Sequence, residues 1–109
     1  MTKKAFTDVF PSPATQSATV WDIQKSVLTT QGLTATTTNT PQSLINSLCK
    51  YLVTLFSLAN RTTNPDETLT VVYDGQTTQT TNGAIYRVDT YRLQFYKSTP
   101  LVDPDPDDY

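Results

Sequence analysis

Residues 40–60 read TPQSLINSLCKYLVTLFSLAN and are the best-defined element of the chain. Thr40 is a favourable helix N-cap, and proline, here Pro41, is favoured at the first helical position. At about 100° per residue, the apolar side chains fall on one broad face. That face comprises Leu44, Leu48, Tyr51, Leu52, Leu55, Leu58 and Ala59, and it is widened by Ile45, Cys49 and Phe56. The stretch predicts an amphipathic helix that buries this side in a core.

The opposite face of this helix is polar but carries a single charge. It consists of Ser43, Asn46, Ser47, Lys50, Thr54 and Ser57. A solvated helix face usually interleaves acidic and basic residues, whereas uncharged polar groups cost less to desolvate. The face that includes Ser43, Ser47 and Thr54 could therefore pack against a partner protein, and the sequence leaves its burial open.

Strand patterns follow the helix after a polar turn over residues 61–67. Residues 68–73 alternate with period two, and residues 84–97 predict a long strand with a bulge near Asp89-Thr90. Asp74-Gly75 and Asn82-Gly83 are two-residue hairpin signals. Residues 76–81 are wholly polar, which fits a solvent-facing strand or a loop tip. We expect a meander of two or three antiparallel strands, with the helices covering the face that carries Leu69, Val71, Tyr91, Leu93 and Phe95.

The segment before the long helix is less regular. Residues 19–31 predict a short helix capped by Gly32, with a strand over residues 19–23 as the alternative. Residues 33–39 are threonine-rich and predict a loop or a short edge strand. The predicted fold class is α+β, with one or two helices packed on a small antiparallel β-meander.

Both ends of the chain lack a periodic apolar pattern and predict extended arms. Residues 1–18 form the N-terminal arm, residues 19–97 a single compact domain, and residues 98–109 an acidic C-terminal arm. Prolines keep such segments extended. The side chains that we expect to contact other proteins are Phe10, Pro11, Asp103, Asp105, Asp107 and Tyr109.

The residue inventory argues against an enzyme. The chain has no histidine, and Cys49 is its one cysteine, so it offers neither the usual general base nor an internal disulfide nor the usual zinc ligands. Cys49 lies at the edge of the apolar helix face, as a buried small hydrophobe would. A cap and two turns account for the three glycines, Gly32, Gly75 and Gly83. We expect no catalytic residue, no cofactor and no metal.

Charge and hydropathy also limit the partners. The net charge of −2 argues against nucleic acid or an anionic membrane, and no apolar run is long enough to cross a bilayer. No secretion signal is recognisable at the N-terminus. Residues 1–61 carry five basic and two acidic residues, whereas residues 62–109 carry three basic and eight acidic ones. This asymmetry fits head-to-tail pairing of copies or a merely acidic tail.

The surface composition suggests association with other subunits. Twenty-two of the 109 residues are threonine. A chain this short often needs a disulfide, a bound metal or a partner subunit to reach ordinary stability. We therefore predict a non-enzymatic structural subunit of a larger protein assembly. A bacteriophage virion protein assembled in the host cytoplasm fits best, either a capsid decoration (cement) protein or a neck or tail component. Its partners would be copies of itself or other virion proteins in an oligomer or lattice. The alternative is a soluble binding module that recognises a protein or a carbohydrate through an aromatic strand face, with Tyr86, Tyr91, Phe95 and Tyr96 as the aromatic set.

Overall fold

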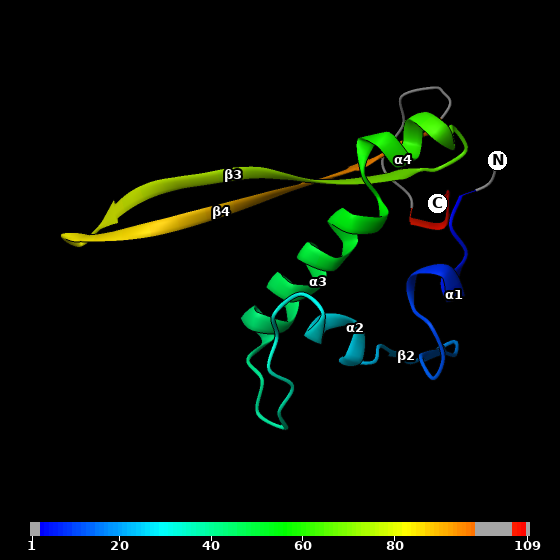
Figure 1. Cartoon of the computed structure of the whole chain (residues 1–109), viewed down its shortest axis with the longest axis horizontal. Coiled ribbons are helices and arrows are strands. Elements are labelled where there is room, and N and C mark those ends of the chain that lie inside the picture. The colour runs from blue at the N-terminus through cyan, green and yellow to red at the C-terminus, as the bar shows by residue number, and fades with distance from the viewer. Residues whose placement is uncertain (1–2, 98–105, 109) are drawn as a thin grey trace.

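The computed structural model describes residues 3–97 and 106–108. Its architecture is α+β, as predicted, with helical segments packed at one end of a long hairpin (Figure 1). The helices are α1 (Phe6–Val9), α2 (Ser26–Thr29), α3 (Pro41–Leu55) and α4 (Leu58–Thr63), followed by a 3₁₀ turn at Pro106–Asp108. The strands are β1 (Thr15–Gln16), β2 (Trp21–Asp22), β3 (Leu69–Thr81) and β4 (Ala84–Phe95). β1 pairs with β2 and β3 pairs with β4, both antiparallel.

Helix α3 starts where the sequence predicts and ends earlier. The Thr40 hydroxyl oxygen accepts a hydrogen bond from the Ser43 amide at 3.1 Å, and Pro41 opens the helix. The single helix expected through residue 60 is wrong, because the chain leaves helical geometry at Phe56. Ser57 then caps α4 by accepting from the Asn60 amide at 3.0 Å. A serine cap that starts a second helix accounts for the break.

The expected meander is a single long hairpin. The Asn82-Gly83 turn is confirmed, with positive φ angles of 49° and 79°, as a tight hairpin requires. The turn expected at Asp74-Gly75 is wrong: β3 runs through it with a register shift between Tyr73 and Gly75. Gly75 has φ 98°, and a glycine in this region fits a bulge as well as a turn. The irregularity expected near Asp89-Thr90 therefore lies on the facing strand, at Asp74.

The short helix expected over residues 19–31 is reduced to α2, and its alternative, a strand, is partly present as β2. The Ser17 hydroxyl oxygen accepts hydrogen bonds from the Thr19 and Val20 amides, at 3.3 and 3.1 Å. This turn directs β2 back along β1 and so competes with a helix start there. Gly32, with φ 97°, follows α2 as predicted, and its amide donates to the Thr29 carbonyl.

The core is small and includes the N-terminal segment. Val9, Phe56 and Val71 are buried at its centre, and the partly buried side chains around them are Phe10, Tyr51, Leu52, Val53, Leu55 and Leu69. The Tyr51 hydroxyl donates to the Val9 carbonyl. The extended arm expected over residues 1–18 thus contains the helical turn α1, because burying Val9 holds that segment against α3 and β3.

The helices cover less of the sheet than predicted. Both α3 and α4 pack against β3. Val71 is fully buried, whereas Leu93 and Phe95 on β4 are 44% and 57% exposed. The expectation that the helices cover Leu93 and Phe95 is therefore wrong, since the short helical layer ends over β3.

The chain is less compact than an ordinary domain of its size. Its radius of gyration is 16.3 Å, against about 13 Å for a compact domain of this length. Its accessible surface is 7936 Å², against about 6,000 Å² for a typical monomer of this mass. The projecting hairpin accounts for the difference in shape (Figure 1).

Docking of the N-terminal segment can be tested with two matched substitutions. Val9→Ala should lower the free energy of unfolding by about 2 kcal/mol, because it leaves a cavity in the core. Val20→Ala, at a side chain that is 53% exposed, should change it by less than about 0.5 kcal/mol. Urea unfolding followed by circular dichroism measures both. Equal effects would show that residues 3–10 do not belong to the core.

Candidate functional site

The distal half of the β3–β4 hairpin is the most prominent surface feature. It extends beyond the helices (Figure 1), and every β3 residue from Gln76 to Thr81 is exposed. Ile85 on β4 is 76% exposed and Tyr86 is 55% exposed. An isolated two-stranded hairpin is marginally stable in water at best. A projection of this length is therefore suited to packing against another molecule.

The two edges of the hairpin differ. At the base of β3, the outward-pointing amide of Val71 donates to the Phe56 carbonyl at 2.8 Å, so the connection between α3 and α4 closes the base of that edge. Among the residues that the structure describes, no third strand pairs with β4 and no other segment hydrogen-bonds to its backbone between Ile85 and Leu93. The β4 edge presents unpaired backbone groups, which are a template for strand pairing.

The alternation of hydrogen-bonded pairs along the hairpin determines which backbone N–H and C=O groups of β4 face away from β3. The Tyr96 amide donates to the Thr68 carbonyl at 2.7 Å, so Tyr96 points its backbone groups toward β3. Antiparallel strands alternate hydrogen-bonded and non-hydrogen-bonded pairs. With the observed register, even-numbered β4 residues face β3 and odd-numbered residues face the open edge. The outward set is Ile85, Arg87, Asp89, Tyr91 and Leu93.

A polar and aromatic cluster occupies one face of the hairpin beyond the bulge. The Tyr73 and Tyr91 rings lie with centroids 5.1 Å apart. The Tyr73 hydroxyl donates to Asp89 Oδ1 at 2.8 Å, and Arg87 Nε lies 3.3 Å from Asp89 Oδ2. The hydrogen bond to the Asp89 carboxylate, together with burial and the nearby negative charge, raises the pKa of Tyr73. The Arg87 side chain is 68% exposed, so it remains available to a second molecule.

The aromatic residues of β4 do not form one platform. Alternation along the strand places Tyr91 and Phe95 on one face and Tyr86 and Tyr96 on the other. The Arg61 guanidinium lies 3.9 Å from the Tyr96 ring centroid, and the Tyr96 hydroxyl hydrogen-bonds with Thr70. Tyr96 is therefore engaged within the domain, and the aromatic strand face expected for a binding module is divided between two surfaces.

The predicted contact residues lie in different environments. Phe10 is half-buried, with its ring 5.5 Å from that of Phe6 and 5.1 Å from that of Trp21. Pro11 is exposed beside it. Asp107 is exposed in the 3₁₀ turn. The remaining three predicted contact residues, Asp103, Asp105 and Tyr109, lie outside the described residues. Phe10 thus packs on its own domain, and the structure does not bring the described members together.

The polar face of α3 is partly covered by the chain itself. Ser47 is only 4% exposed, and its hydroxyl donates to the backbone carbonyls of the preceding turn. Lys50 Nζ donates to the Gln31 carbonyl at 2.8 Å, which ties α3 to the segment after α2. Thr54 is exposed. One end of this face is therefore already used internally.

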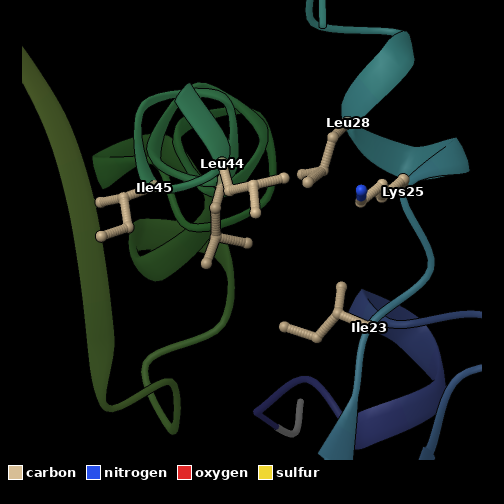
Figure 2. Close-up of a pocket in the computed structure, with 6 residues that line it drawn as sticks. Ile23, Lys25, Leu28, Leu44 and Ile45 are labelled. Carbon is tan, nitrogen blue, oxygen red and sulfur yellow. The ribbon is translucent and has the colours of Figure 1, made fainter. Parts of the chain in front are cut away.

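A shallow apolar groove of about 190 Å³ separates α2 from α3. Figure 2 shows Leu28 and Leu44 facing each other across it, with Ile23 and Lys25 on the side of Leu28. Ile45, which is 61% exposed, projects from α3 on the side away from Leu28 (Figure 2). Because Ile45 is exposed, the buried face of α3 is narrower than the apolar face that the sequence predicts for this helix.

The described residues contain little reactive chemistry. Burial raises the pKa of the Cys49 thiol, which lowers the thiolate fraction that a nucleophile needs. Within residues 3–97 and 106–108, no three His, Cys, Asp or Glu side chains are grouped as metal ligands. No helix in that part of the chain has the length and apolarity to cross a membrane.

Sequence reasoning missed the β4 edge as an interaction surface. The available signal was Asn82-Gly83, which marks the tip of the hairpin formed by residues 69–81 and 84–95. The competing signal at Asp74-Gly75 concealed it. Comparisons with protein-family models, with curated proteins and with solved structures found no match to this chain.

The contact between Tyr73 and Asp89 predicts a pH dependence. Because the folded-state pKa of Tyr73 is raised, the stability from this contact is present below the ordinary tyrosine pKa of about 10 and is lost as the pH rises through the folded value. Asp89→Asn should lower the pKa of Tyr73 toward its ordinary value. Arg92→Gln, on the opposite face, should leave it unchanged. NMR titration of the Tyr73 ring carbon measures the pKa, and an unchanged value in Asp89→Asn would contradict the assignment.

Proposed function

We propose that this protein is a non-enzymatic structural subunit of a larger protein assembly and that the β3–β4 hairpin is its main contact surface. The observation that carries the proposal is the projection from a small core of a long, two-stranded hairpin, whose β4 edge pairs with no other segment among the described residues. Such an edge invites pairing with another chain, and proteins that remain monomeric usually cover or shorten it.

The distribution of apolar side chains supports this role. The buried apolar residues among those described are Val9, Leu28, Phe56 and Val71. Larger apolar side chains remain exposed, and those on the hairpin are Tyr73, Ile85, Tyr86, Leu93 and Phe95. Burying such side chains against a partner contributes roughly 25 cal/mol for each Å² of apolar surface removed from water. Association would therefore stabilise the hairpin as well as join the subunits.

A bacteriophage virion is the class of assembly that the composition fits best. The threonine-rich, sparsely charged surface loses little solvation when it packs against other subunits. Within a virion the chain would serve as a capsid decoration protein or as a neck or tail component. The C-terminal residues Asp103, Asp105, Asp107 and Tyr109 would supply a second contact. A binding module with an aromatic strand face has less support, because its aromatic residues lie on opposite faces of β4.

A shortened hairpin tests the proposal. Removing residues 76–81 and 84–89 leaves Asn82-Gly83 to connect Gly75 with Thr90, which already face each other in the register. The shortened variant should unfold at the same midpoint urea concentration as the full-length chain, because its core is unchanged. In the cells that normally make the protein, tagged full-length chain should sediment with particles far larger than 12.1 kDa, whereas the shortened chain should stay in the slow fractions.

Thr37→Ala, in the exposed loop before α3, serves as the matched control and should sediment like the full-length chain. If the full-length chain itself stays in the slow fractions, the subunit role is wrong. If the shortened chain still sediments with particles, the assignment of the contact to the hairpin is wrong.

A further inference from the structure

The open edge of β4 has a charge pattern that complements itself. Arg87 and Asp89 are two residues apart, so both project from the same face of the strand and both direct their backbone groups toward the open edge. The distal half of β3, residues 76–81, has no charged side chain. Between the two edges, only that of β4 specifies a pairing register through charge.

Arg87 and Asp89 already pair with each other within one chain, and one antiparallel register of β4 with a second β4 also places opposite charges across from each other. When the two-fold axis passes through Val88, Arg87 lies opposite the partner's Asp89, and the same pair is repeated on the other side of the axis. Moving the axis to residue 87 or 89 places two like charges opposite each other, which destabilises a strand pair. Opposite charges that face each other stabilise it.

The neighbouring residues agree with this register. Ile85, which is 76% exposed, lies opposite the partner's Tyr91, and aromatic residues pair favourably with β-branched ones across strands. The direction of the backbone groups also agrees with this register. Every odd-numbered residue lies opposite an odd-numbered residue of the other copy, and both direct their backbone N–H and C=O groups toward the shared edge. Val88 faces its own copy as a non-hydrogen-bonded pair.

From these observations we infer that two copies of this chain join through their β4 edges, antiparallel and centred on Val88, into a continuous four-stranded sheet. The helices pack mainly against β3, and Asn46 and Lys50 of α3 share a pocket with Arg87, Asp89 and Tyr91, so the incoming strand adds at the β4 edge beside that pocket. A two-fold contact uses the same surface on both copies and is closed. The inference deepens the proposed subunit role, since it names a second copy as the occupant of the hairpin edge.

Disulfide cross-linking tests the register. In a Cys49→Ser background, which removes the one native thiol, Val88→Cys should give a covalent dimer under mild oxidation. Residues opposite each other in a non-hydrogen-bonded pair have Cα atoms about 4.5 Å apart, within disulfide range. Tyr86→Cys and Thr90→Cys alone should not form dimers, because each lies about 13 Å along the strand from its own copy. The double variant Tyr86→Cys/Thr90→Cys should form them. Cross-linking by Tyr86→Cys or Thr90→Cys but not by Val88→Cys would overturn the register.

Charge reversal tests the same pairing without cysteine. Arg87→Asp or Asp89→Arg should weaken self-association about tenfold or more, because each variant places like charges opposite each other twice. A mixture of the two variants should recover association, since every Asp of one chain then faces an Arg of the other. The double variant Arg87→Asp/Asp89→Arg should recover it within one chain. Sedimentation velocity measures the association, with circular dichroism to verify that each variant is folded. Failure of both the mixture and the double variant to recover association would overturn the inference.

The two proposals fail separately. A full-length chain that sediments with large particles but gives no Val88→Cys dimer would retain the subunit role and overturn the β4 pairing. A chain that gives the dimer but never sediments with particles would retain the pairing and overturn the larger assembly.

Discussion

The hydrogen bond from the Val71 amide to the Phe56 carbonyl, at 2.8 Å, is the contact on which the rest of the fold depends. It forms because α3 ends at Leu55, which frees the Phe56 carbonyl and turns the Phe56 ring into the core beside Val9 and Val71. Ser57 then starts α4 in a new direction. One break in a helix thereby joins the helical layer to the sheet, completes the core and closes the base of the β3 edge.

The same contact produces the asymmetry of the hairpin. Because the connection between α3 and α4 covers the base of β3, the helices pack against that strand, and β4 is left at the outside. Thr70 and Val71, adjacent residues on opposite faces of β3, are both fully buried, while Leu93 and Phe95 on β4 are exposed. The surface that is available for another molecule is therefore determined by which strand the helices cover. The chemistry of the side chains on β3 and β4 matters less for this surface than which of the two strands the helices cover.

Sequence reasoning performed well wherever a local signal had one structural meaning. Thr40 and Pro41 predicted the start of α3, and Asn82-Gly83 predicted the tip of the hairpin. It failed where one signal fits two structures. Asp74-Gly75 is compatible with a turn or a bulge, because both use a glycine with positive φ, and the pairing of residues 76–81 with 84–89 decided between them. The expected partner contact at Phe10 stays a prediction: its ring packs on its own domain, and an apolar side chain docks on its own core or on a partner by the same physics.

The sequence by itself determined the fold class, the start of the long helix, the hairpin tip and a residue inventory without histidine. These properties follow from composition and from patterns spanning a few residues. Only the tertiary structure decided that α3 stops at Leu55, that Val9 belongs to the core and that no other segment within residues 3–97 and 106–108 pairs with the β4 edge. Each of these depends on contacts between residues far apart in the chain: Phe56 with Val71, Tyr51 with Val9, and the helices with β3 in preference to β4. The physical reason is that burial and strand pairing depend on which distant surfaces meet, and a local pattern specifies only that an apolar face or an unpaired edge must be covered.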